Sequence, residues 1–316
     1  MLSRIDPMVR LILAAMLLAS LLPATGAVRG VVQGVADVAI FLLFLLYGLK
    51  LARADVLAGI GNLRLLLPLT LWVFGVMGLA GWGVWQVSSG WVAPLLALGF
   101  LYLGVLPSTV QSATVYSSLA GGNVASSVVA AALLNIIGVF VSAPLFSLLA
   151  GSAGGGIHAG SLAKVMTMML LPFVVGQMAQ GFAGGWVKAH KATISLLERG
   201  TIGLAVYVSF SGAVREGVWS RVDLPSWGVL ALGCAVLLVA GYGGSWLLGR
   251  MLGLSRGDRI AMVFAGAQKS VAMGAPLATV LFKPAVAGII LLPLLVYHLA
   301  QMVVAAPIAA RLRAGD

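Results

Sequence analysis

The chain has 316 residues, of which 61% are hydrophobic and 9% are charged. Soluble domains carry about 25% charged residues, so this composition excludes a soluble globular enzyme, a disordered chain and an ordinary nucleic-acid binder. The net charge of +11 comes from basic residues that are few and scattered, as in the cytoplasmic loops of membrane proteins. At about 30 residues for each span and its loop, the length predicts about ten membrane spans.

Ten apolar runs follow one another along the chain, separated by turn residues and charges. Hydrocarbon offers no partner to an unpaired peptide group, so we expect each run to form a helix. The predicted fold is therefore an all-α polytopic membrane protein with ten transmembrane helices. The runs cover residues 8–23, 31–49, 66–86, 93–118, 124–149, 161–182, 200–216, 226–249, 257–282 and 286–310.

The first run allows two interpretations. Arg4 and Arg10 flank the start of a short apolar stretch that leads to Ala24-Thr25-Gly26-Ala27, a pattern shared by cleaved signal peptides. We favour a first transmembrane helix, because it gives ten spans and completes the repeat described below.

The basic residues predict the orientation. If the N-terminus is cytoplasmic, 13 Lys and Arg lie on the inner side and 5 on the outer side. This bias predicts a multi-pass protein of the plasma (inner) membrane with both termini cytoplasmic. The inner set is Arg4, Arg10, Lys50, Arg53, Arg64, Lys188, Lys191, Arg199, Arg250, Arg256, Arg259, Arg311 and Arg313, and the outer set is Arg29, Lys164, Arg215, Arg221 and Lys283. Lys269, within the ninth run, is the one basic residue that belongs to neither side.

A glycine-rich stretch at 151–160 separates two halves of five runs each, residues 1–150 and 160–316. Because five is odd, the two halves would cross the membrane in opposite directions. Short echoes support a repeat: Ser142-Ala143-Pro144-Leu145 ends the fifth run and Ala305-Ala306-Pro307-Ile308 ends the tenth. The predicted architecture is two inverted five-helix repeats, which many secondary transporters share.

The fourth and ninth runs are the least helix-like. Non-helical backbone at membrane depth is viable where it faces protein or a water-filled cavity, so two broken helices in matching positions indicate a substrate site. The polar and helix-breaking residues are Pro107, Ser108, Thr109, Gln111, Ser112, Thr114, Ser117 and Ser118 in the fourth run, and Gly266, Gln268, Lys269, Ser270, Gly274 and Pro276 in the ninth. We expect Pro107, Gly274 and Pro276 to break the helices.

These residues also carry a resemblance to a known family. Pro107-Ser108-Thr109, Thr114 and Gly122-Asn123-Val124-Ala125-Ser126-Ser127 resemble the fourth and fifth spans of the bile acid:sodium symporter family. Gly266-Ala267-Gln268-Lys269-Ser270 with Gly274-Ala275-Pro276-Leu277 resembles the ninth span of its SBF-like branch. The resemblance implies a panel domain of spans 1, 2, 6 and 7, a core domain of spans 3–5 and 8–10, and broken fourth and ninth helices that cross near the midplane.

The resemblance also implies positions for sodium. Alignment on the quoted motifs retains Ser127 and Gln268 among the family's sodium ligands, and Thr114 offers a substitute hydroxyl. Phe264 stands where relatives have a shared glutamate. A hard cation usually needs a carboxylate nearby, so a Na⁺ site at Thr114, Ser127 and Gln268 would be incomplete. We therefore expect the ammonium of Lys269 to occupy the region that sodium fills in relatives, as a built-in charge or a proton carrier.

The predicted function is a secondary active transporter that moves a small organic anion by alternating access, coupled to Na⁺ or H⁺. The anion would be bile-acid-like or another amphipathic carboxylate or sulfonate. We expect no cofactor. We expect no ATP, because phosphate-binding loop motifs are absent, and no nucleic acid, because the basic residues are few and scattered. The candidate substrate or ion contacts are Gln111, Ser112, Thr114, Asn123, Ser127, Gln268, Lys269 and Ser270.

Two alternatives stay open. A cation/proton antiporter of related design would pair a membrane lysine with an aspartate, although paired intramembrane carboxylates are lacking here. An intramembrane lipid-modifying enzyme would need clustered carboxylates, whereas the eight acidic residues are scattered.

Four further polar residues lie in or near the runs. We expect Asn135 and Ser142 to form hydrogen bonds between helices, His298 to pack as a satisfied histidine, and Asp37 to face water at a span edge.

Overall fold

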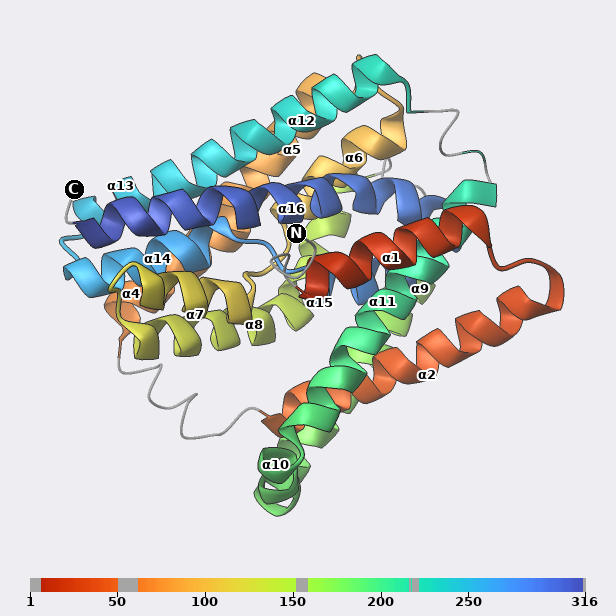
Figure 1. Ribbon diagram of the computed structural model, residues 1–316, viewed down its shortest axis with the longest axis horizontal. Helices are drawn as coiled ribbons and strands as arrows, with labels where there is room; N and C mark the ends of the chain where they lie inside the picture. Colours follow the sequence, from red (N-terminus) through yellow and green to blue (C-terminus); the bar gives the residue numbers. More distant parts are fainter. Residues whose placement is uncertain (1–6, 51–61, 152–158, 216, 218–221, 315–316) are drawn as a thin grey trace. The chain divides into compact units, whose positions relative to one another are not determined.

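The computed structural model describes residues 7–50, 62–151, 159–215, 217 and 222–314. Every secondary-structure element in these ranges is helical, which confirms the all-α prediction (Figure 1). The helices are α1 (Pro7–Leu21), α2 (Gly26–Lys50), α4 (Leu63–Thr70), η2 (Leu71–Val76), α5 (Met77–Ser88), α6 (Pro94–Gly104), α7 (Val110–Leu119), α8 (Val124–Ala150), α9 (Ala159–Val165), η4 (Met166–Leu170), α10 (Leu171–Ala189), α11 (Lys191–Arg215), α12 (Leu224–Val239), η6 (Ala240–Gly244), α13 (Ser245–Met251), α14 (Arg256–Ala267), α15 (Val271–Leu281) and α16 (Pro284–Ala314).

Seven stretches of the described chain are long and apolar enough to cross a membrane, so the protein is a multi-pass membrane protein. They are Gly26–Lys50, Leu63–Ser88, Val124–Ala150, Ala163–Val187, Leu224–Met251, Arg256–Leu281 and Pro284–Ala314. Three of the ten predicted runs fall outside this set for physical reasons: α1 and α6 are short, and α11 carries charged residues in its first half. The ten-span arrangement therefore stays a prediction.

The contacts divide the chain into two compact units, each built from separate segments. Unit 1 draws on residues 1–52, 155–223 and 274–291, and unit 2 draws on 53–154, 224–273 and 292–316. The basic residues Arg4, Arg53 and Arg221 and most of the predicted glycine-rich divider at 151–160 lie outside the described residues.

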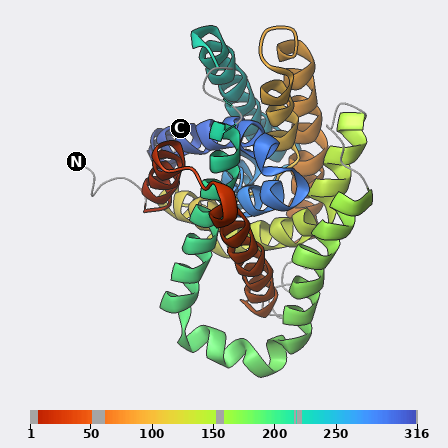
Figure 2. The same cartoon turned by 90° about the vertical axis from the view of Figure 1, so that its right-hand side faces the viewer.

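Glycines permit close helix packing within unit 1. A Cβ atom at Gly48 of α2 would lie 2.1 Å from the Phe173 carbonyl oxygen of α10, and one at Gly176 would lie 2.2 Å from that of Leu45. In the same unit α1 packs on α11, where the Tyr207 hydroxyl donates to the Leu22 carbonyl at 2.9 Å. Figure 2 shows the bend at which α10 passes into α11.

The core of unit 2 lies between the segment α4–η2, α8 and α14. Leu69, Val73, Leu134 and Met262 are each at most 1% exposed and belong to one apolar cluster. In η2 the helix widens into a π-helical turn, a local distortion that is often found at functional sites. The next helix, α5, packs closely on α6.

Two helical spans are interrupted at positions that lie within unit 2. Residues 105–109 separate α6 from α7, and Gln268–Ser270 separate α14 from α15. Pro107 lies in the first break, as expected, but Gly274 and Pro276 lie within α15 instead of at the second break. Pro276 lies in the middle of α15, where it removes one backbone donor but does not end the helix.

Candidate functional site

The two helix breaks contact each other in unit 2. The Ser270 N–H donates to the Pro107 carbonyl at 3.0 Å. The Ser112 hydroxyl, at the start of α7, donates to the Gln268 Oε1 atom at 2.5 Å. Helix ends carry partial charges, positive at the N-termini of α7 and α15 and negative at the C-termini of α6 and α14. The breaks therefore bring both signs of helix-end charge to one buried region.

Side chains from α8 satisfy the peptide groups of the first break. The Asn135 amide donates to the Ser108 carbonyl at 2.7 Å, and the Ser142 hydroxyl donates to the Val105 carbonyl at 2.9 Å. These bonds confirm the expectation that both residues link helices. They replace helical hydrogen bonds that the break removes, as buried peptide groups require.

Side chains from α16 satisfy the second break. The Gln301 Oε1 atom accepts from the Lys269 N–H at 2.8 Å, while its Nε2 atom donates to the Lys269 carbonyl at 3.2 Å. The Tyr297 hydroxyl donates to the Ala267 carbonyl at 2.5 Å. Sequence reasoning missed Gln301 and Tyr297, although a single amide inside the apolar run 286–310 was a usable signal. His298 interacts with Gln301 at 2.8 Å, in agreement with the packing role.

The Lys269 side chain is fully buried, and its ammonium is surrounded by backbone oxygens. The Nζ atom donates to the carbonyls of Gly104 at 2.7 Å, Leu106 at 2.8 Å and Val73 at 3.2 Å. Gly104 is the last residue of α6 and Leu106 lies in the first break just after it, where carbonyls lack helical partners. Val73 lies in the π-helical turn η2. We call these three oxygens the carbonyl site.

The predicted sodium ligands meet only part of the requirement. Thr114 Oγ1 and Ser127 Oγ are buried oxygens without a hydrogen-bond partner in the described part of the chain, which is unusual and suits an unseen ligand. Gln268 uses its oxygen for Ser112, and its Nε2 donor is the atom left over. Two of the three residues therefore present a free oxygen.

Three of the predicted contacts take other roles. Gln111 is exposed on α7. Asn123 is the exposed N-cap of α8, where its Oδ1 accepts from the Ser126 N–H at 3.1 Å and its Nδ2 donates to Asp258 at 2.9 Å. Ser270 caps the start of α15, because its hydroxyl accepts from the Met273 N–H at 3.2 Å. Asn and Ser favour helix N-caps, which explains why a motif containing them marks the helix start.

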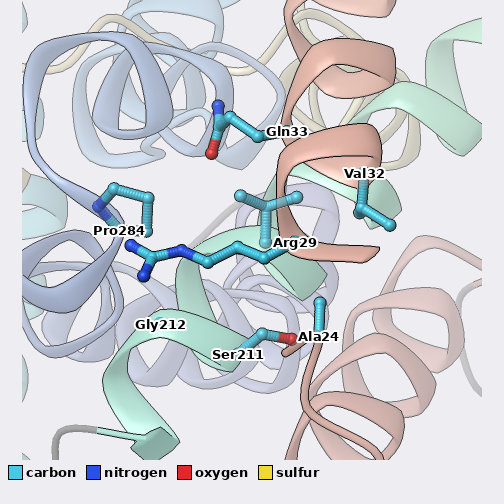
Figure 3. Close-up of a pocket in the computed structure, with 8 residues that line it drawn as sticks. Ala24, Arg29, Val32, Gln33, Ser211, Gly212 and Pro284 are labelled. Atoms are coloured by element: carbon cyan, nitrogen blue, oxygen red, sulfur yellow. The ribbon is translucent and has the colours of Figure 1, made fainter. Parts of the chain in front are cut away.

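A separate small pocket lies within unit 1 (Figure 3). Arg29, Gln33 and Ser211 supply its polar groups, and its cavity volume is about 10 Å³. That is about the space one water molecule needs, so the pocket is far too small for an amphipathic organic anion. One turn further along α2, Asp37 accepts from Gln33 at 2.9 Å and pairs with Lys164 at 3.4 Å, so this carboxylate is paired rather than only water-facing.

Comparison with known proteins decides the family. The family model described as the SBF-like CPA transporter family matches residues 6–314. The chain belongs to this family. The prediction from the quoted motifs is confirmed, and the SBF-like chain is a transporter rather than an enzyme.

Several curated proteins are similar over most of the SBF-like chain. The uncharacterized protein PA2026 of Pseudomonas aeruginosa is 37% identical over 301 residues, covering 95% of this chain and 90% of its own length. The proposed symporter YfeH of Escherichia coli is 37% identical over 311 residues, covering 97% and 92%. Sodium/bile acid cotransporter 7 of Mus musculus is 22% identical over 281 residues, covering 85% and 80%.

Proposed function

We propose that this SBF-like protein is a secondary active transporter that moves a small organic anion across the inner membrane by alternating access. The observation that carries the proposal is the contact between two interrupted helices, through Ser270 and Pro107, beside buried polar side chains. Interrupted helices of this kind form substrate and ion sites in secondary transporters. Family membership supports the same conclusion.

An organic anion suits the charges at the breaks. The N-termini of α7 and α15 direct peptide N–H groups and positive partial charge toward this region, and Lys269 adds a buried cation. The named relatives include a sodium/bile acid cotransporter, so a carboxylate or sulfonate with an apolar body is the first class to test. Ser112 and Gln268 are the proposed substrate or ion contacts, with Thr114 and Ser127 as oxygen donors.

Alternating access would involve a panel domain and a core domain formed from two inverted repeats. The two compact units support this division, because each contains corresponding segments of the halves 1–150 and 160–316. Unit 1 corresponds mainly to the proposed panel (spans 1, 2, 6 and 7). Unit 2 corresponds mainly to the proposed core (spans 3–5 and 8–10).

The coupling ion is Na⁺ or H⁺. Thr114 and Ser127 favour Na⁺ because their hydroxyl oxygens are available. The missing glutamate at Phe264 and the buried Lys269 favour a cycle without a family-type sodium site. In a cation/proton antiporter, the alternative function, Lys269 would be expected beside a carboxylate, whereas the hydrogen-bond partners of its ammonium are three backbone carbonyls.

Uptake into proteoliposomes tests the proposal. We expect at least one amphipathic carboxylate or sulfonate to accumulate, and either an imposed Na⁺ gradient or an imposed pH gradient to accelerate its uptake. Ser112→Ala should reduce that uptake about tenfold, because it removes the buried hydrogen bond to Gln268. Ser89→Ala, in an exposed turn, is the matched control. Acceleration by neither gradient for any anion tested would contradict a coupled symporter.

A further inference from the structure

The carbonyl site around Lys269 has the composition of a monovalent-cation site. Its ligands are backbone oxygens from η2, from the end of α6 and from the first break, brought together in the interior of unit 2. Backbone carbonyls at helix ends and unwound segments coordinate monovalent cations in transporters. The carbonyl oxygens of Gly104 and Leu106 accept no hydrogen bond from an N–H group of α6. They therefore need another donor or a cation.

The Lys269 ammonium has as many N–H donors as the carbonyl site has acceptor oxygens. An ammonium has three N–H donors, and the three carbonyls lie 2.7, 2.8 and 3.2 Å from Nζ. The residue is 0% exposed, so its ammonium does not reach the surface of the described structure. The negative partial charge at the C-terminus of α6 compensates the positive charge without a carboxylate.

The backbone of Lys269 is fixed independently of its side chain. Gln301 holds both the N–H and the carbonyl of this residue, so the stem of the side chain starts from a constrained peptide. The ammonium is thereby attached to the second break while it binds oxygens of η2 and of the first break. The side chain links three segments that lie far apart in the sequence, the most distant pair 196 positions apart.

We propose that the oxygens of Val73, Gly104 and Leu106 form a monovalent-cation site whose resident cation is the tethered ammonium of Lys269. A mobile cation is therefore not exchanged at this position. The consequence for coupling, that the cycle uses no Na⁺ at the carbonyl site, rests on the proposed transport function. The existence of the cation site does not rest on the transport function, because it is tested by the stability of the protein alone.

Chemical replacement of the ammonium tests the proposal. Lys269→Ala removes the stem beyond Cβ together with Nζ, a fragment with the size of n-propylammonium. The variant would be extracted and purified in n-propylammonium chloride, in sodium chloride or in choline chloride at equal ionic strength. The readouts are the yield of monodisperse protein in size-exclusion chromatography and the Tm in detergent.

We expect the yield and Tm of Lys269→Ala to be lowest in choline chloride, which has no N–H donor, and to rise by at least 5 °C in n-propylammonium or sodium chloride. The wild type should show no such difference between salts. Lys269→Met, whose apolar stem fills the space of the added cation, should be unstable in all three salts. Lys283→Ala removes an exposed lysine and should behave as the wild type.

The same salt response in the wild type and in Lys269→Ala would overturn the proposal, as would equal stability of Lys269→Ala and the wild type in choline chloride. Failure to recover Lys269→Ala in any salt would also count against it, since the site would then not accept a free cation. If the stability results hold and no anion is transported, the cation site stands and the transport function fails. If an anion is transported and the salts have no effect on stability, the transport function stands and the cation site fails.

Discussion

Gln301 shows how one side chain can fix the geometry of a helix break. Its amide donates to the Lys269 carbonyl and accepts from the Lys269 N–H, so one side chain satisfies both groups of a single residue. Both groups are buried, and unpaired peptide groups in an apolar interior are costly. The residue therefore stabilises the interrupted backbone from which the Lys269 side chain extends.

Gln301→Leu should lower the free energy of unfolding by about 2 kcal/mol, because two buried peptide groups lose their partners. Gln301→Glu should have a smaller effect, since a carboxylate or carboxyl group still offers an acceptor to the Lys269 N–H. Thermal unfolding in detergent measures both. Gln86→Leu, an exposed amide on α5, is the control and should be near neutral. Equal Tm values for Gln301→Leu and Gln86→Leu would show that this bond does not stabilise the fold.

At the scale of elements, close contact between α5 and α6 positions the carbonyl site. A Cβ atom at Gly81 would lie 2.5 Å from the Phe100 carbonyl oxygen and 2.8 Å from the Gly104 Cα atom. Small residues permit this approach between membrane helices. The π-helical turns η2 and η6, which directly precede α5 and α13, lie in the third and the eighth predicted spans, which are equivalent positions in the proposed repeat. A further π-helical turn, η4, lies in the sixth predicted span and has no counterpart in α1.

Gly81→Ala should destabilise the protein by about 1–3 kcal/mol, because the added methyl group meets backbone atoms that cannot rotate away. Gly83→Ala on the same helix is the matched control: a Cβ atom there meets nothing within 4 Å. Alanine also favours helix over glycine, so the control should be neutral or slightly stabilising. The comparison is a difference in Tm between the two purified variants. A loss at Gly83 as large as that at Gly81 would contradict the packing argument.

At the scale of the whole molecule, the chain passes between its two compact units several times. The chain passes from unit 1 to unit 2 near residues 52 and 223, after the second and the seventh predicted spans. These are equivalent positions in two halves of five spans. An inverted repeat predicts this equivalence, and it also predicts an even number of spans with both termini on one side. The charge bias predicts that this side is the cytoplasm.

The orientation can be tested with cysteines, because Cys234 is the only native one and is buried. In a Cys234→Ala background, Ser89→Cys marks the predicted outer turn after α5 and Ala314→Cys marks the predicted inner end of α16. A membrane-impermeant maleimide should label Ser89→Cys in intact cells, and Ala314→Cys only after permeabilisation. The unsubstituted background is the control and should stay unlabelled. The opposite pattern would reverse the proposed topology.

The sequence by itself determined that this protein is helical, embedded in a membrane and related to the SBF-like transporters. Those properties depend on composition and on short motifs, and both can be read along the chain. The charge count supplied an orientation to test, and the cluster of polar residues around Pro107 and Gln268 correctly indicated the two breaks. Gly274 and Pro276 were wrong as break positions, since local propensity does not show which peptide groups find distant partners.

Only the tertiary structure decided which groups meet at the breaks. Gln111, Asn123 and Ser270 are polar residues in the right motifs, yet Gln111 is exposed, and Asn123 and Ser270 cap helices. The carbonyl site has no signature in the sequence, because every residue type has a backbone oxygen. Only the fold determines which three oxygens lack a helical N–H partner and surround the Lys269 ammonium. The basic residue left over from the charge count, Lys269, thus gained defined partners through contacts with residues more than 160 positions away.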